Sequence, residues 1–157
     1  MTLEADRARS SIAFRVRHLG VATVHGHFDS FAGRLDAGEA GLRVEGHVDA
    51  ASVATGNRIR DGRLRSEFFD AEHHPAIVLR ANGDGQLAGE LTIRGVTRPI
   101  ELATTVEPHA DGSLRIRASG RIRRSDFGLE WDALRDAGRR LVADEVRLQA
   151  DVVFAKR

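Results

Sequence analysis

The sequence contains no cysteine, which excludes several kinds of chemistry at once. Disulfide cross-links, thiolate nucleophiles, and zinc or iron–sulfur sites with cysteine ligands all need a sulfur that this chain does not supply. No stretch approaches the roughly 20 apolar residues that a membrane-spanning helix needs, so we expect no transmembrane segment. The first ten residues are charged and contain no apolar core, so we expect no secretion signal and a cytoplasmic location.

An excess of charge of one sign is also missing. The 24 basic and 23 acidic residues are interspersed and leave a formal net charge of +1. A protein that binds nucleic acid through bulk positive charge has a clear excess of basic residues. We therefore expect no nucleic-acid partner.

Sequence motifs of common enzyme and nucleotide sites are absent as well. There is no Gly-x-Ser-x-Gly elbow, no Gly-x-x-x-x-Gly-Lys-Ser/Thr phosphate loop and no dinucleotide fingerprint. His25 and His27 have a spacing that suits a metal, but alternation puts them on the wet face of a strand without an evident third ligand. We therefore expect no metal, no cofactor and no catalytic residue.

What the sequence does contain is alternation of apolar and polar residues with a period of two, which is typical of strands with one dry face. Residues 11–17 show this alternation first, and residues 146–154 show it last. The segments 82–85 (NGDG) and 111–112 (DG) predict hairpin turns, because Asn, Asp and Gly tolerate positive φ. About eight such strands with short reversals predict an all-β fold: one domain over residues 1–157, an eight-stranded antiparallel barrel.

Four glycines lie on the apolar phase of their strands, where a core side chain is expected. They are Gly26, Gly46, Gly89 and Gly120. An inward glycine marks a bend of the barrel wall or a place that something else fills. Two interpretations remain open: a hollow barrel with room for a ligand, and a solid barrel in which large neighbouring side chains fill the gaps.

The alternation is lost between about residues 50 and 75, where we expect a short helical insertion. Asn57 is a suitable N-cap for a helix that ends near Ser66. Arg63 follows Ile59 by four residues and is expected on the same inward side of this helix. The apolar residues of the insertion predict that it docks on one end of the barrel, as a plug or a lid. They are Ile59, Leu64, Phe68 and Phe69.

Five blocks stand in order along the chain with consistent separations. They are residues 11–20 (SIAFRVRHLG), 24–28 (VHGHF), 57–70 (NRIRDGRLRSEFFD), 89–99 (GELTIRGVTRP) and 124–131 (RSDFGLEW). In this arrangement the sequence resembles the YceI-like, polyisoprenoid-binding family over nearly its whole length. The resemblance implies a lipocalin-like barrel, often a homodimer, that holds an isoprenoid or another long-chain lipid. Arg63 stands where the family usually has histidine, and Asp132 where it usually has asparagine.

The ligand site expected on this basis is an inward-facing apolar wall. It consists of Phe14, Val16, Val24, Phe28, Leu91, Ile93, Ile116, Val146 and Leu148, with Leu64, Phe68, Phe69, Phe127 and Trp131 near one end. His18, Asp61 and Arg63 are expected to meet the polar head of the ligand. The function expected is non-enzymatic binding, carriage or storage of a polyisoprenoid, an isoprenoid quinone or another long-chain lipid.

Two other functions remain open from the sequence alone. The same barrel could be an enzyme that acts on a lipid-like substrate, with His18 and Asp61 as an acid–base pair. A barrel with a packed interior could instead serve as an interaction or stress-response module. An interior void distinguishes the lipid-binding protein from this last alternative.

Overall fold

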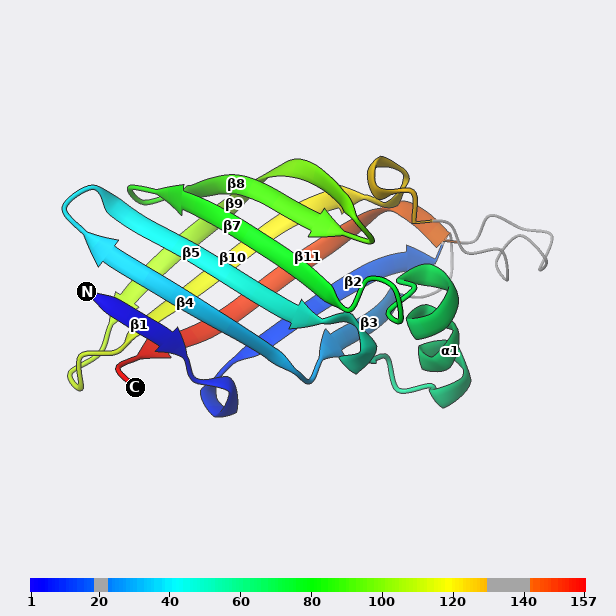
Figure 1. The fold of residues 1–157 in the computed structure, drawn as a ribbon, viewed down its shortest axis with the longest axis horizontal. Helices are drawn as coiled ribbons and strands as arrows, with labels where there is room; N and C mark the ends of the chain where they lie inside the picture. The colour runs from blue at the N-terminus through cyan, green and yellow to red at the C-terminus, as the bar shows by residue number, and fades with distance from the viewer. Residues whose placement is uncertain (19–22, 130–141) are drawn as a thin grey trace.

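The computed structural model describes residues 1–18, 23–129 and 142–157 (Figure 1). Its strands are β1 (Thr2–Ala5), β2 (Ser11–His18), β3 (Thr23–Phe28), β4 (Phe31–Gly38), β5 (Gly41–Asp49), β6 (Val53–Ala54), β7 (Ala76–Gly83), β8 (Leu87–Ile93), β9 (Val96–Pro108), β10 (Leu114–Arg123) and β11 (Val142–Ala155). Its helical elements are η1 (Arg7–Arg9), η2 (Ala50–Ser52), α1 (Arg58–Arg63), the π-helix η3 (Leu64–Phe68) and η4 (Arg124–Phe127). In Figure 1, α1 covers one end of the barrel and both chain termini lie at the other. We call these the helical end and the terminal end.

The strands close into a barrel because β11 pairs with β10 on one side and with β1 and β2 on the other. β1 and β2 both pair antiparallel with β11, β1 near the C-terminal end of β11 and β2 farther back along it. β4 pairs with β1 and β3 pairs with β2, so β3 and β4 together form the next member. The remaining neighbours run β4–β5–β7–β8–β9–β10–β11. The result is an eight-stranded antiparallel lipocalin-like barrel, and it confirms the predicted fold.

The hairpin between β8 and β9 illustrates how local sequence sets these reversals. Ile93 and Val96 are cross-strand partners, which leaves Arg94 and Gly95 as the two turn residues. Both have positive φ, +50° at Arg94 and +76° at Gly95. A turn with two positive φ angles matches the twist of the strands it joins, and glycine adopts that conformation at little cost.

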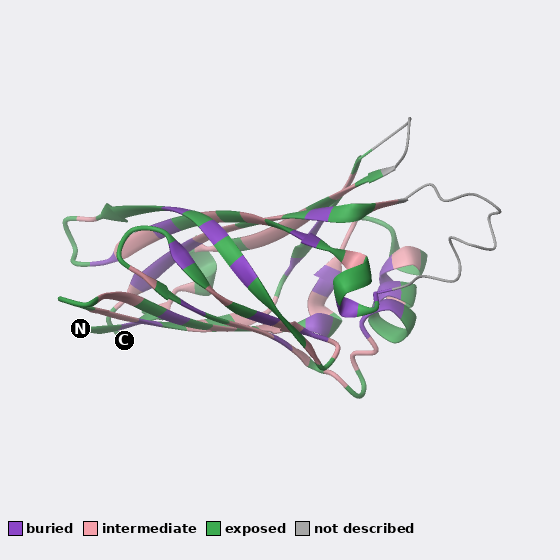
Figure 2. Ribbon diagram, turned by 90° about the horizontal axis from the view of Figure 1, so that it is seen from above, coloured by how far each residue is buried: buried purple, intermediate pink, exposed green. Residues whose placement is uncertain are grey.

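Toward the terminal end of the barrel, a layer of inward side chains is buried. Leu3 on β1 is the register partner of Leu35 on β4, and both residues are 0% exposed. Leu35 is paired with Val44, and Val44 with Ala81, so one layer of inward side chains continues across four neighbouring strands. Alternation of buried and exposed residues is clearest on β9, from Ile100 to Thr104, and Figure 2 shows such bands on the barrel. This layer forms a floor for whatever space lies above it.

An ion pair on β10 and β11 ties the last two strands together. The Arg115 guanidinium donates to both oxygens of Asp151, with Nε–Oδ1 and Nη2–Oδ2 distances of 2.7 and 2.6 Å. Arg117 lies nearby, with its Nε 3.5 Å from Asp151 Oδ2. The hydrogen bond from Arg115 is the main reason why the pKa of Asp151 lies below its ordinary value. The folded state therefore favours the ionised carboxylate.

Replacing this carboxylate is expected to destabilise the barrel in a pH-dependent way. Because the pKa is lowered on folding, the stabilisation is fully present above the unfolded pKa of about 4 and is lost as the pH falls through the lower folded value. Asp151→Asn should lower the free energy of unfolding by about 1 kcal/mol at pH 7. Urea titrations should show this deficit shrinking below about pH 4. A deficit that stays constant with pH would assign the loss to packing instead of charge.

Candidate ligand-binding cavity

The barrel contains a partly open cavity of about 240 Å³ above the floor of Leu3 and Leu35. Each of the eight barrel strands contributes inward side chains to its wall. Several of these, including Phe14, Val16 and Leu148, are only half-buried although they face inward, because they border the open space. Among the described residues, the wall has four polar side chains. They are Thr55, Arg60, Arg124 and Gln149.

Most of the apolar residues predicted for the ligand site lie in this wall. They are Phe14, Val16, Val24, Phe28, Leu64, Phe68, Phe69, Leu91, Ile93, Ile116, Val146 and Leu148. Phe127 is buried in η4 but is not part of the wall. Trp131, Asp132 and the side chain of His18 lie outside the described residues. Contact of any of these residues with a ligand stays a prediction.

The inward glycines show that the hollow and the solid interpretations hold at different positions. The ring of Phe14 covers Gly26, so a side chain at Gly26 would overlap that ring. Leu102 lies against Gly120 in a similar way, 3.0 Å from where a Cβ would be. Gly46 instead borders the cavity, and a Cβ there would have no neighbour closer than 3.9 Å. Open space therefore remains at Gly46.

The insertion forms a short helix that closes the helical end from outside, much as predicted. Asn57 is its N-cap, and its Oδ1 accepts a hydrogen bond from the Arg60 backbone N–H at 3.0 Å. After Arg63 the helix widens into the π-turn of η3, which is the kind of irregularity often found at functional sites. Leu64 is buried and faces the cavity.

An aromatic cluster joins this segment to the barrel wall. The rings of Phe68 and Phe69 meet edge to face, with centroids 4.9 Å apart. Phe69 contacts Phe28 at 5.9 Å, and Phe28 contacts Phe14 at 5.5 Å. These contacts hold the helical segment on the cavity.

Two residues of the helix contradict the prediction that they face inward. Ile59 is 76% exposed, and Arg63 is exposed and is not part of the cavity wall. The buried side of α1 is taken by Asp61, whose Oδ1 accepts from the Thr55 backbone N–H at 2.9 Å and from the Thr55 hydroxyl at 2.5 Å. A residue two positions away from a buried one lies on the opposite side of an α-helix, so Ile59 and Arg63 face outward. Asp61 is also absent from the cavity wall.

Arg60 and Arg124, which the sequence analysis did not select, border the cavity near the helical end. Arg60 donates through Nε to the Thr55 hydroxyl at 2.8 Å and through Nη2 to the Thr55 carbonyl at 2.9 Å. Arg124 donates to the carbonyls of Ala143 at 2.9 Å and Leu129 at 3.1 Å. Both are half-buried, so two guanidinium groups lie beside an otherwise apolar space. The arrangement suits a molecule with an apolar chain and a polar or anionic end.

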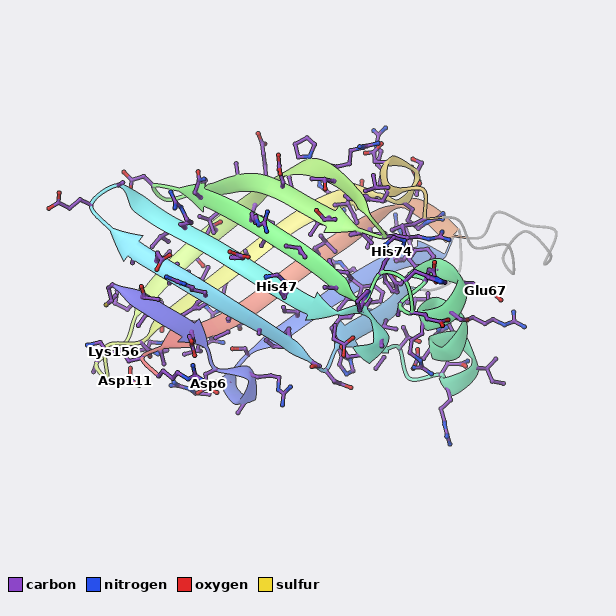
Figure 3. The ribbon with its side chains drawn as sticks, viewed as in Figure 1. Asp6, His47, Glu67, His74, Asp111 and Lys156 are labelled. Atoms are coloured by element: carbon purple, nitrogen blue, oxygen red, sulfur yellow. The ribbon has the colours of Figure 1, made fainter. Side chains whose placement is uncertain are left out.

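Within the described ranges, no three His, Asp or Glu side chains are grouped so that they could hold a metal ion. His25 and His27 are exposed, and the His27 Nε2 lies 2.9 Å from Asp29 Oδ1. Figure 3 shows His47 midway along the barrel and His74 at the helical end. Among the residues that the structure describes, no helix is long and apolar enough to cross a membrane.

Comparison with known proteins identifies the family. The model of the YceI-like domain matches residues 3–154. The chain belongs to the YceI-like family. A UPF0312 protein of Staphylococcus aureus strain MSSA476 is 28% identical over 162 residues, covering 96% of this YceI-like chain and 95% of that relative.

Solved structures agree on the YceI-like barrel. A polyisoprenoid-binding domain from Saccharophagus degradans, implicated in plant cell wall breakdown, superposes with a TM-score of 0.87 at 19% identity, over 99% of this chain and 98% of that one. BcnA of Burkholderia cenocepacia gives 0.83 at 22% identity, over 95% and 98%. The YCEI protein of Campylobacter jejuni gives 0.70 at 25% identity, over 90% of each chain. At 19% and 22% identity, the first two likenesses establish the fold alone.

Proposed function

We propose that this YceI-like barrel binds the apolar chain of an isoprenoid or another lipid and does not catalyse a reaction. The observation that carries the proposal is the apolar cavity of about 240 Å³ above a layer of buried side chains. Burial of apolar chain is favourable by about 0.8 kcal/mol per methylene before ordering costs. An apolar void of about 150 Å³ is large enough to hold benzene, so this cavity has room for about ten carbon atoms, or two isoprene units.

A longer chain has to extend beyond this space. Among the described residues above the cavity, Phe69 rests on the barrel through its contact with Phe28, and Phe68 packs against Phe69. Such contacts contribute about 0.5–1.5 kcal/mol each beyond their buried area, which is comparable with the burial of one or two methylenes. We infer that a polyprenyl chain longer than two isoprene units displaces this pair of rings or passes beside them.

The polar end of the ligand is assigned to Arg60 and Arg124. Both guanidinium groups border the cavity, and Arg60 uses only its Nε and Nη2 atoms on Thr55. Across the described residues, no carboxylate lies within ion-pair distance of the Arg60 side chain. The Thr55 hydroxyl separates Arg60 from the buried Asp61 carboxylate, so the guanidinium makes no direct ion pair. A half-buried guanidinium in this state favours an anionic partner such as a phosphate or a carboxylate.

The contacts of the candidate acid and base groups support binding over catalysis. Asp61 is buried, lies outside the cavity wall, and has its Oδ1 engaged by Thr55. Ser113 Oγ lies 3.2 Å from His109 Nδ1, but it donates to Asp111 Oδ1 at 2.6 Å and the residue is 2% exposed. A nucleophile has to reach its substrate, and this serine does not. The cytoplasmic location and the homodimer expected from the sequence stay predictions.

Titration of delipidated protein with prenyl phosphates of increasing chain length tests the proposal. We expect one ligand per barrel in native mass spectrometry. Affinity should rise about tenfold for every two carbons up to about ten carbons, and more slowly beyond. The rise should slow because the enclosed space is then full. Absence of uptake, or an affinity that does not depend on chain length, would exclude the cavity as the binding site.

The head-group assignment has its own comparison within the same titration. Arg60→Gln should weaken binding of a prenyl phosphate about tenfold and leave binding of the matching prenyl alcohol nearly unchanged. Only the phosphate carries a negative charge that the Arg60 guanidinium stabilises. Circular dichroism checks that the variant keeps its fold. An equal loss for both ligands would mean that Arg60 supports the wall without recognising the head.

A further inference from the structure

The outer side of the helical segment carries a surface that the cavity does not use. Ile59 is the most exposed large hydrophobic residue among those the structure describes, at 76%. Successive residues of an α-helix are rotated by about 100°, which puts Ile59 opposite Asp61 and Leu64. Exposed arginines lie beside this isoleucine on α1 and farther along the segment in η3. They are Arg58, Arg63 and Arg65.

Exposed positive charge exceeds exposed negative charge on this segment, although the charge of the whole chain is balanced. Within 58–68 the carboxylates are Asp61, which is buried against Thr55, and Glu67, which is exposed at the helical end in Figure 3. In the portion of the chain that the structure describes, no hydrogen-bond or ion-pair partner is found for the side chains of the three exposed arginines. The surface therefore presents free cations around one apolar side chain.

We propose that this surface, formed by Arg58, Ile59, Arg63 and Arg65, docks on an anionic lipid bilayer. Ile59 inserts between the lipid head groups, and the three arginines lie beside the lipid phosphates. Each arginine close to an anionic membrane raises the binding constant about fivefold, and insertion of the isoleucine adds at least about tenfold. Binding of this strength is reversible.

The position of the surface favours a bilayer over an acidic protein or a nucleic acid. The same short segment has Ile59 on its outer side and Leu64, Phe68 and Phe69 on its inner side, where they line the cavity. The docked face and the end of the cavity are thus one helix apart. A lipid chain that left a bilayer here would cross only this segment. Membrane docking goes beyond the proposed function, because it uses the outer surface and not the cavity. It can therefore be measured without any ligand in the cavity.

Flotation of the full chain with lipid vesicles tests the docking surface. Two compositions are compared, phosphatidylcholine alone and phosphatidylcholine mixed with phosphatidylglycerol. We expect binding to the mixed vesicles, binding at least about tenfold weaker to the neutral ones, and a steep loss with added salt. Ile59→Ser should weaken binding about tenfold, and the triple change of Arg58, Arg63 and Arg65 to Gln about 100-fold.

Matched variants on the barrel wall separate this surface from general stickiness. Val106→Ser removes another exposed apolar side chain, and a triple Gln variant of Arg43, Arg98 and Arg121 removes equal charge elsewhere. Both controls should bind like the unaltered protein. Equal losses in the test and control variants, or equal binding to both vesicle types, would overturn the proposal. So would capture of a homopolymeric RNA with no vesicle binding. Because all these residues are exposed, the variants should unfold at the same temperature as the parent.

Discussion

Gly46→Leu is expected to weaken prenyl binding about 100-fold while the barrel stays folded. Gly46 lies on the inward face of β5 between Val44 and Val48, and all three border the cavity. A Cβ at this position has no neighbour closer than 3.9 Å, so the added side chain enters open space. A leucine fills the room of about four of the ten carbons, which removes about 3 kcal/mol of apolar burial from the ligand.

The control for this variant is the same substitution at the end of β4. Gly38 is exposed and does not border the cavity, and a Cβ added there would have no atom within 4 Å. Gly38→Leu should therefore leave ligand affinity unchanged. Calorimetric titration with a ten-carbon prenyl phosphate measures both variants, and denaturant unfolding shows that both are folded. Unchanged affinity in Gly46→Leu would put the ligand outside the barrel.

The barrel itself follows from the sequence because one face of every strand has to be dry. Alternation and turn residues determine which side chains face inward, and this is why most of the predicted wall residues do line the cavity. Alternation does not reveal that one barrel member is broken at η1. There the Asp6 side chain accepts a hydrogen bond from the Ala8 backbone N–H at 3.1 Å. This bond caps the 3-10 turn of η1, which interrupts the strand.

The polar end of the site was beyond prediction for a different physical reason. The rotation of a short helix about its axis depends on which of its polar groups finds a buried partner, and Asp61 finds Thr55. That pairing turns Arg60 toward the cavity and Ile59 toward solvent, against the ordinary preference of isoleucine. The space inside the barrel is equally a matter of side-chain conformation, since the Phe14 ring covers Gly26 while nothing covers Gly46. Sequence alternation contains neither kind of information.

The largest loss of stability is expected from Gly89→Ala, which should lower the free energy of unfolding by more than about 3 kcal/mol. Gly89 on β8 is the register partner of Ala81 on β7, and the two backbones approach closely there. A Cβ at Gly89 would overlap the carbonyl oxygen of Arg80 and lie 2.7 Å from the Cα of Ala81. A flexible side chain can move aside, but a backbone carbonyl moves only if the β7–β8 hydrogen bonds break.

The same substitution at Gly46 should not lower the free energy of unfolding, which makes the two glycines a matched pair. Both lie on inward faces of neighbouring regions of the sheet, but a methyl group at Gly46 meets open space. Alanine also restricts the unfolded chain more than glycine does, so Gly46→Ala should be neutral or stabilise by up to about 1 kcal/mol. Urea unfolding of the two variants measures the difference directly. Similar stabilities would mean that β7 and β8 can separate locally without cost, and close backbone approach would then not be what requires glycine at position 89.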